Sequence, residues 1–190
     1  NGSLFFIDVE NLQTTIFDPS IVNLFFSDNA ANAEILGMEG TVTWAPASIP
    51  GLTVSGAFSF LDTEITDVLT PTDDVQEGDT LAFAPEFQGN LRARYEWDLE
   101  NGMRAHVMPH LAYSEEAYSD IITINRQKLD SWLMVGVTAG VSTGSWMAEL
   151  FVDNLTDEAA ELSMNYVNDR NRPTLARPLT AGVRFSYDFQ

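Results

Sequence analysis

Apolar and polar residues alternate with a period of two along most of this chain. The clearest case is the last segment, residues 177–189, where every second residue from Leu179 to Phe189 is apolar and most of the residues between them are polar. Because successive side chains of a strand point to opposite faces of a sheet, this pattern predicts a β-strand with one apolar and one polar face. The alternation alone fits two kinds of protein. In a soluble sandwich the apolar face meets a second sheet, and in a barrel in lipid it points outward.

The same alternation predicts seven earlier strands, all in an antiparallel all-β fold. It is imperfect in the first of them. In the fifth it is interrupted by Pro109, which has no N–H to donate and therefore predicts a bulge or a local kink. The seven strands are expected at residues 3–17, about 38–44, 52–67, 81–97, 103–113, 132–141 and 146–158.

The connections between the predicted strands alternate in length. Outer-membrane barrels have short periplasmic turns and long extracellular loops, so this order favours a transmembrane barrel with its C-terminus in the periplasm. Strands of about 12–16 residues are also longer than the ~5–6 residues usual in soluble sheets and the ~9–11 needed to cross a bilayer. The short connections are residues 46–51, 98–102 and 143–145, and the long ones are 18–32, 68–80, 114–128 and 154–176.

Aromatic residues give an independent indication of this orientation. A tryptophan on the apolar face flanks each short turn, and Phe189 falls at the same level by topology. Transmembrane barrels carry girdles of aromatic residues at the membrane interfaces. We therefore expect a periplasmic girdle made of Trp44, Trp97, Trp146 and Phe189.

The dipeptide Asn101-Gly102 allows the register of one hairpin to be predicted. Asn-Gly is the strongest short-range signal for a two-residue hairpin turn. Pairing around it places residues whose numbers sum to roughly 200 opposite one another on the polar face. The expected pairs are Glu96 with Arg104, Arg94 with His106, and Asn90 with His110.

Composition narrows the class of protein. Hydrophobic residues make up 45% of the 190 residues, yet no apolar run approaches the ~18 residues of a transmembrane helix. A formal net charge of -19 argues against nucleic acid as a partner, because a phosphate backbone requires a basic surface. The chain has no cysteine, which excludes disulfides, thiolate catalysis and zinc–sulfur sites.

The first residues do not have the features of a secretory signal. Residues 1–7 lack a charged leading region, a long apolar core and a small-residue cleavage site, and they read as the middle of a strand. A chain that opens inside a membrane strand would leave backbone groups without partners in lipid. Two explanations fit these first residues. Either they are the mature start left after a signal was removed, or the chain is a fragment of a longer one, and we expect the fragment.

No catalytic constellation is present, so neither an enzyme nor a cofactor is expected. The polar face carries cationic and imidazole side chains that can contact a small-molecule ligand in a lumen, and these candidates are Arg92, Arg94, His106 and His110. The alternative role is structural. The histidines then hydrogen-bond across the polar face, and the arginines of that face, Arg104 and Arg184 included, form an ion-pair network with Glu96, Glu149 and Asp188.

One long connection is acidic. Asp73, Asp74, Glu77 and Asp79 lie close together in it and can bind calcium, although they lack the spacing of an EF-hand loop. The alternative is an ordinary solvated loop.

Three stretches resemble TonB-dependent outer-membrane receptors. They are NAANAEILGMEGTVTWAP at residues 29–46, LAFAPEFQGNLRARYEW at 81–97 and LFVDNLTDE at 150–158. By this resemblance DNLTDE marks where the seventh strand leaves the membrane through ordinary turn chemistry. The family generally ends on the aromatic residue, so Gln190 is a departure from its pattern.

The resemblance implies a barrel of about 22 strands with a plug domain filling its lumen. Residues 1–190 would supply about eight strands from the C-terminal part of that barrel, and the earlier strands, the plug and the TonB box would lie outside them.

The resemblance also implies a location and partners. The location is the outer membrane of a Gram-negative bacterium, and the activity is TonB-energised uptake of a scarce small molecule, such as a siderophore-chelated metal, cobalamin or an oligosaccharide. The implied partners are TonB, the plug, outer-membrane lipid and lipopolysaccharide, and the barrel-assembly machinery, which would contact the C-terminal strand. The alternative is a stand-alone barrel of eight strands, which would act as an anchor or a narrow pore filled by its own side chains.

Overall fold

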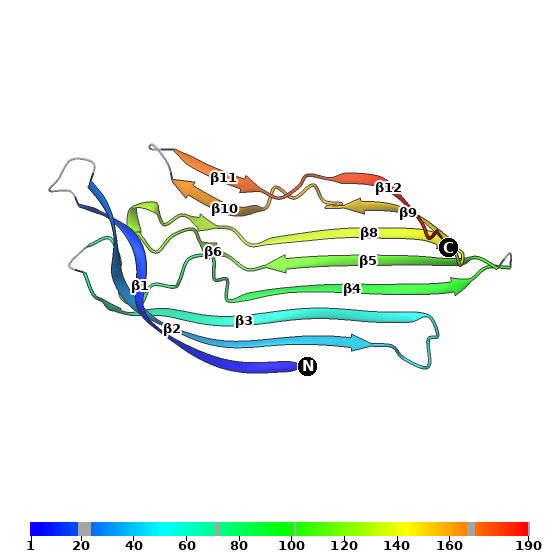
Figure 1. Cartoon of the computed structure of the whole chain (residues 1–190), viewed down its shortest axis with the longest axis horizontal. Helices are drawn as coiled ribbons and strands as arrows, with labels where there is room; N and C mark the ends of the chain where they lie inside the picture. The colour runs from blue at the N-terminus through cyan, green and yellow to red at the C-terminus, as the bar shows by residue number, and fades with distance from the viewer. Residues whose placement is uncertain (19–23, 71–72, 101, 167–169, 190) are drawn as a thin grey trace.

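Eight antiparallel strands form one continuous sheet in the computed structural model of this chain (Figure 1). The structure describes residues 1–18, 24–70, 73–100, 102–166 and 170–189. Strands that are neighbours in the sheet follow one another along the chain, and every pair is antiparallel, which confirms the predicted architecture. In sheet order, the strands are β1 (Gly2–Asp18), β2 (Leu24–Trp44), β3 (Leu52–Val68), β4 (Phe87–Asp98), β5 (Arg104–Ser114), β8 (Trp132–Ser142), β9 (Trp146–Asp153) and β12 (Thr180–Tyr187).

The remaining elements lie in two of the long connections. The connection between β5 and β8 contains β6 (Ala117–Tyr118), which pairs with β7 (Lys128–Leu129), and the short 3-10 helix η1 (Thr123–Asn125). The connection between β9 and β12 contains a separate hairpin of β10 (Glu161–Tyr166) and β11 (Asn171–Leu175). Within the described ranges, no helix is long and apolar enough to cross a membrane.

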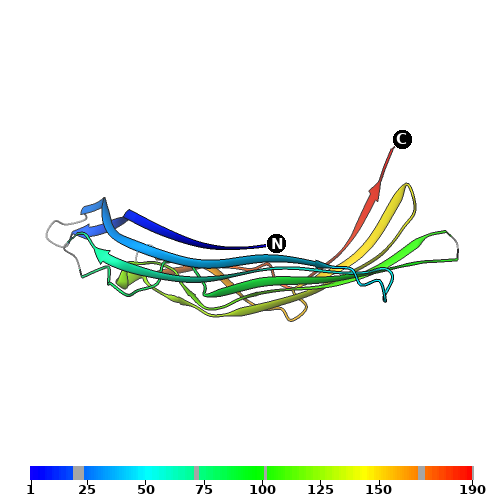
Figure 2. The ribbon, with the colours of Figure 1, turned by 90° about the horizontal axis from the view of Figure 1, so that it is seen from below.

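The sheet is open. Among the described residues, β1 pairs with β2 alone and β12 pairs with β9 alone, so the first and last strands do not close a barrel with each other. Figure 1 shows these two strands at opposite margins of the sheet, and Figure 2 shows that the sheet is curved. Both margins therefore present backbone N–H and C=O groups that a further strand can pair with.

The two faces of the sheet differ as the alternation predicts. On the apolar face Leu4, Val183 and Leu150 are 79%, 72% and 63% exposed, whereas on the polar face His106 and Glu149 are 2% and 6% exposed. A soluble sandwich would bury the apolar face against a second sheet. The exposure of this face contradicts the sandwich and fits a sheet whose apolar side faces lipid.

Two strand boundaries differ from those predicted. β2 already begins at Leu24, so much of the predicted connection 18–32 is strand, and the turn itself lies outside the described residues. The alanines that suggested a loop are completely buried at Ala30, Ala31 and Ala33. In contrast, β4 begins only at Phe87, because residues 81–86 fold into a connection in which Phe83 adopts a positive φ of 54°.

The predicted register of the β4–β5 hairpin is wrong by two residues. The structure pairs Glu96 with His106, and Arg92 with His110. The Leu99 N–H donates to the Met103 carbonyl at 2.8 Å, so the loop that this bond closes is longer than a two-residue turn. Asn101 lies outside the described residues. Since the shift is even, every side chain keeps its predicted face.

Of the bulge or local kink predicted at Pro109, the structure shows no bulge. Pro109 pairs with Val137 in a β5–β8 ladder that runs without a register shift from Arg104 to Ser114. The pairs on the β4 side, Tyr95 with Val107 and Arg92 with His110, keep one register on either side of the proline.

Two strand ends follow from turn chemistry. β9 ends at Asp153, earlier than predicted, because Asn154 adopts a positive φ of 52°. The Asn154 side-chain amide donates to the carbonyls of Glu158 and Arg177, so it holds together the two ends of the β9–β12 connection. The segment DNLTDE is thus a turn, as the sequence indicated, and the last strand starts at Thr180.

Candidate functional site

The candidate ligand residues of the polar face lie on β4 and β5. The Arg92 Nε donates to the Ser55 Oγ at 2.8 Å, and the Arg94 Nε contacts a Glu96 carboxylate oxygen at 2.7 Å. The structure therefore gives both arginines structural partners, in line with the alternative role considered for them. Contact of these side chains with a substrate stays a prediction.

Among the described residues of the polar face, His106 takes part in the most buried contact between two ionisable side chains. Its Nε2 lies 3.0 Å from Glu149 Oε1, and the two side chains are 1% and 6% exposed. The other carboxylate oxygen of Glu149 accepts a hydrogen bond of 2.9 Å from Arg184 Nη1. One carboxylate thus joins β5, β9 and β12, and a buried carboxylate with two such partners is well compensated.

Gly140 makes this contact possible. It pairs with His106 on one side and with Glu149 on the other, so β8 runs between the two side chains. A Cβ at Gly140 would lie 2.8 Å from Glu149 Cγ and 2.8 Å from His106 Cε1. Only a residue without a side chain leaves room for His106 and Glu149 to meet over the strand between them.

A second row repeats this arrangement four residues away. Gly136 pairs with His110, and His110 Nε2 lies 3.4 Å from Asp153 Oδ1. This row is more open, with side-chain exposures of 34% and 48%. His110 Nδ1 is buried without a hydrogen-bond partner, so this imidazole is less completely satisfied than His106.

Two connections pack together beyond the strand ends. Val75, Ile121 and Ile122 are nearly fully buried in a cluster that also includes Ala30, Ala31 and Ile65 of the strands. Leu81 N–H donates to the Thr63 hydroxyl, which ties the first connection to β3. We call residues 73–86 and 115–131 together the cap.

Arg126 links the two halves of the cap. Its Nη1 donates to the carbonyls of Thr80 and Asp120, each at 2.9 Å, and its guanidinium stands 4.0 Å from the centroid of the Tyr118 ring. Asp79 lies 3.7 Å from Arg126 Nε. The acidic connection is therefore folded against its neighbour, while the carboxylates of Asp73 and Glu77 are exposed to solvent.

The calcium alternative finds no support in this connection. Across the ranges that the structure describes, no group of three or more His, Cys, Asp or Glu residues is arranged to hold a metal ion.

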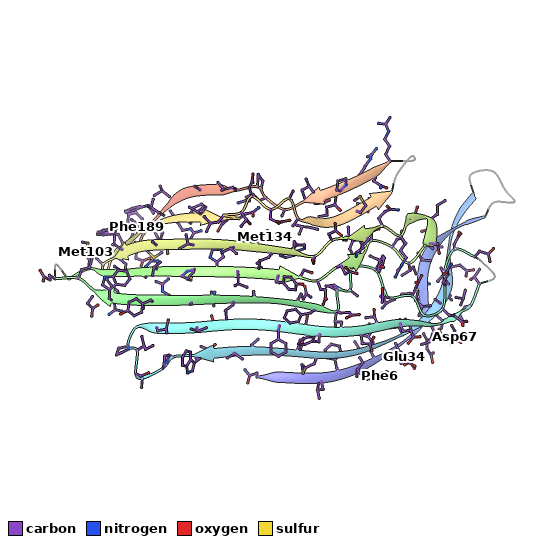
Figure 3. The ribbon with its side chains drawn as sticks, turned by 180° about the vertical axis from the view of Figure 1, so that it is seen from behind. Phe6, Glu34, Asp67, Met103, Met134 and Phe189 are labelled. Atoms are coloured by element: carbon purple, nitrogen blue, oxygen red, sulfur yellow. The ribbon has the colours of Figure 1, made fainter. Side chains whose placement is uncertain are left out.

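The predicted girdle residues lie on the apolar face at the turn end of the sheet. Trp44 and Trp97 are 55% and 40% exposed, and Phe189 is 91% exposed. Trp146 stacks on Phe185 with ring centroids 6.3 Å apart. Figure 3 shows Phe189 at the same end of the sheet as Met103, which follows the second short turn. Their role at a membrane interface stays a prediction.

A second aromatic row at the other end of the strands was not predicted. Phe60 and Phe87 have ring centroids 4.6 Å apart, and Phe87 and Tyr113 have centroids 5.9 Å apart. We call these three residues the outer aromatic row. Phe87 is the first residue of β4 and Tyr113 the next to last of β5, whereas Phe60 lies in the middle of β3 and pairs with Phe87. The late start of β4 is what places Phe87 at the strand end.

Carboxylates also lie in a row on the apolar face of β1, β2 and β3. Asp8 pairs with Glu34, and Glu34 pairs with Glu64. The apolar residues Phe6 and Leu36 form the next pair toward the turn end. Figure 3 shows Phe6 and Glu34 close to one another on the neighbouring strands.

The exposed apolar face, the polar face crossed by ion pairs and the alternating connections define a segment of a transmembrane β-barrel. A model of the family described as TonB dependent receptor-like, beta-barrel, matches residues 1–155. The chain belongs to this family.

Solved structures share the fold. The chain is similar to FyuA, the ferric yersiniabactin uptake receptor from Yersinia pestis, with a TM-score of 0.79 and 16% identity over 100% of this chain and 27% of that one. It is also similar to BauA, the ferric preacinetobactin receptor from Acinetobacter baumannii, with a TM-score of 0.72 and 21% identity over 99% of this chain and 27% of that one. The chain thus spans about a quarter of these proteins. No curated protein matches the sequence.

Proposed function

We propose that this chain is the C-terminal part of the barrel wall of an outer-membrane receptor that takes up a ferric siderophore when TonB is energised. The observation that carries the proposal is the family match over residues 1–155 on a sheet whose two margins are both open. In a complete receptor, further strands of the same protein would pair with β1 and β12, and a plug domain would contact the polar face. Such a protein resides in the outer membrane of a Gram-negative bacterium.

The open margins argue against the stand-alone barrel of eight strands. In such a barrel β1 would pair with β12. In the described part of the chain these strands have no partner beyond β2 and β9, respectively. In lipid each unpaired backbone group costs several kcal/mol, so this sheet needs neighbours in order to span a membrane. The edge of β12 is also where the barrel-assembly machinery would contact the chain.

The siderophore class rests on the solved structures of similar fold. FyuA is a ferric yersiniabactin uptake receptor, BauA is the ferric preacinetobactin receptor, and FpvA from P. aeruginosa was solved with bound pyoverdine and iron. On the polar face of this chain, Arg92 is exposed and its guanidinium suits an anionic chelate, and the side chain of His110 is 34% exposed. We regard them as the first residues to test for substrate contact.

The test uses the full-length receptor in a strain that lacks its own copy. Cells grown without iron are given radioactive iron bound to yersiniabactin, preacinetobactin or pyoverdine, and the label taken up is counted. The proposal expects uptake of at least one chelate, which is lost when TonB is deleted. Labelled cobalamin and a labelled oligosaccharide serve as alternative substrates. Uptake that does not depend on TonB, or uptake of cobalamin or the oligosaccharide alone, would contradict the proposal.

A further inference from the structure

The polar face of the sheet contains a hollow of about 620 Å³, a volume within the ~300–1,000 Å³ of typical small-molecule pockets. Apart from Phe58 and Tyr113, the side chains that line it lie on this face. They include the uncharged polar side chains of Thr41, Ser59, Gln88 and Asn90. Glu39 is the charged side chain of the lining, and its carboxylate accepts a hydrogen bond of 2.9 Å from the Ser3 hydroxyl. The hollow therefore offers neutral hydrogen-bonding groups and no cationic side chain.

One wall of the hollow is formed by Trp132. The other three tryptophans of the chain lie on the apolar face at the turn end, whereas Trp132 is the first residue of β8 and lies on the polar face. In the described part of the chain, no ring contact and no hydrogen bond engages its side chain. An indole at the edge of a cavity, without a protein partner, can pack against a flat ligand.

Gln88 and Trp132 stand on either side of β5. Ser114 pairs with Gln88 on one side and with Trp132 on the other, and Ala112 pairs with Asn90 in the neighbouring row. Figure 1 shows β4, β5 and β8 side by side. Neighbouring strands are ~4.7–4.9 Å apart, so β4 and β8 are about 9–10 Å apart, with only small side chains of β5 between them in these two rows. This space, which we call the Trp132 slot, is bounded by Gln88, Asn90 and Trp132 and is wide enough for one six-membered ring.

The Trp132 slot lies where the strands meet the cap. Gln88 is the second residue of β4, and Trp132 is the first residue of β8. In a barrel whose long connections are extracellular, a ligand that enters the lumen reaches these strand ends first. The next row toward the turn end pairs Arg92 with His110, the residues proposed to contact the chelate. Neighbouring rows on one face are ~6–7 Å apart, so a single ligand can reach both the slot and Arg92.

We propose that the Trp132 slot binds a neutral sugar ring that the ferric chelate carries. The inference rests on the proposed function, uptake of a ferric chelate, and names the class of chelate. The faces of a sugar ring present C–H groups, which can pack on the Trp132 indole. Its hydroxyls donate and accept hydrogen bonds, and the side-chain amides of Gln88 and Asn90 can match both roles. The substrate is then a glycosylated chelate, with its sugar in the slot and its anionic metal centre beside Arg92.

The experiment measures the binding of methyl glycosides to the full-length receptor, purified in a detergent that has no sugar headgroup. Saturation-transfer NMR with methyl glucoside, methyl galactoside and methyl mannoside detects the ligand protons that contact the protein, and a titration gives each Kd. Trp132→Leu removes the indole and Asn90→Ala removes an amide. Trp97→Leu, the same substitution on the apolar face, is the matched control. Catechol and N-acetylglycinamide test whether the slot instead takes an aryl ring or a peptide group.

Transfer to the ring C–H protons of at least one glycoside is expected. Its Kd should rise about tenfold in Trp132→Leu and about fivefold in Asn90→Ala, and it should be unchanged in the control. The absence of transfer to every glycoside would overturn the proposal, and so would equal Kd values in the wild type and both slot variants, or binding of catechol or N-acetylglycinamide alone. A receptor that takes up its chelate but binds no glycoside refutes this inference alone, whereas uptake without TonB refutes the proposed function.

Discussion

His106 and Glu149 are in contact across a strand to which neither belongs. Their side chains meet at 3.0 Å over Gly140 of β8, and Arg184 reaches the same carboxylate from β12. Each backbone ladder joins only two neighbouring strands. The side-chain contact instead links four strands, β5, β8, β9 and β12. A substitution at any of these residues should therefore lower the stability of the whole C-terminal half of the sheet.

Gly140→Ala should destabilise the barrel. The new Cβ would stand 2.6 Å from the Ala148 carbonyl oxygen as well as against His106 and Glu149, and overpacking of this kind costs ~1–3 kcal/mol. The measurement is a denaturant titration of the full-length receptor in lipid bilayers. Ala139→Val, on the opposite face at the next residue, is the control and should change the free energy of unfolding little. An unchanged midpoint for Gly140→Ala would mean that the row is not as tightly packed as the structure shows.

Glu149→Ala should cost ~1–3 kcal/mol, because it leaves the buried His106 Nε2 without a partner. The effect should come mainly from His106, since Arg184 is 60% exposed and can turn to water. The same titration applied to Asp98→Ala, which removes the exposed pair with Arg104, should give a much smaller loss of stability, because both side chains are in contact with solvent. Equal losses in the two variants would contradict the idea that burial makes the Glu149 contact important.

Charge insertion should distinguish the two faces. Val137→Arg places a charge on the apolar face and should cost ~2–4 kcal/mol near the bilayer midplane. Asn90→Arg adds the same side chain to an exposed position of the polar face and should cost much less. The buried Thr138, also on the polar face, is unsuitable for this comparison because it is only 6% exposed. If both arginines destabilise the barrel equally in bilayers, the apolar face does not meet lipid.

Arg126→Ala should loosen the cap. The change removes the hydrogen bonds that join Thr80 to Asp120 through the guanidinium, and hydrogen exchange of amides in both connections should rise. Lys128→Ala is the control in the same connection. Its partner Glu116 lies 2.6 Å away, and the hydrogen bond between them raises the pKa of Lys128. Lys128 is therefore fully protonated below the ordinary lysine pKa, and the pair is intact at neutral pH. Because the pair of Lys128 and Glu116 is exposed, its loss should leave the amides of the cap protected from hydrogen exchange.

The isolated chain should not form a native pore. Residues 1–190 expressed alone should aggregate or remain unfolded in detergent, because no other described strand pairs with the outer edge of β1 or of β12. Joined to the rest of the receptor, the same residues should fold. A monomer of the isolated chain that shows heat-modifiable migration on a gel would exclude the receptor assignment and favour the stand-alone barrel.

The existence of the strands and the face on which each side chain lies were predictable, because both depend on the alternation of apolar and polar residues alone. The β4–β5 register was predicted two residues away from the observed one, yet Arg94 and His106 still share a face, since an even shift changes no side-chain direction. The boundaries of β2 and β4 were not predictable. Ala30 and Ala31 look like loop residues until the cap, which is distant in sequence, buries them.

The sequence predicted only part of the contact between His106 and Glu149. Both residues were placed on the polar face, but their distance depends on the registers of two hairpins and on the glycine between them. One signal was present: the two histidines, the two glycines Gly136 and Gly140, and the two carboxylates of β9 are each four residues apart. Equal spacing on three successive strands indicates rows that lie side by side.

The row of Asp8, Glu34 and Glu64 limits how deeply this wall can sink into the bilayer. Neighbouring like charges repel, and each carboxylate would be costly in hydrocarbon, so all three must stay in the hydrated layer. Strands advance ~3.3 Å per residue, so lowering the wall by one pair of residues would move the whole row ~6–7 Å inward. In the proposed membrane placement, these three carboxylates, together with Asp62 one residue pair nearer the turn end, therefore set the depth that this end of the wall can reach in the bilayer.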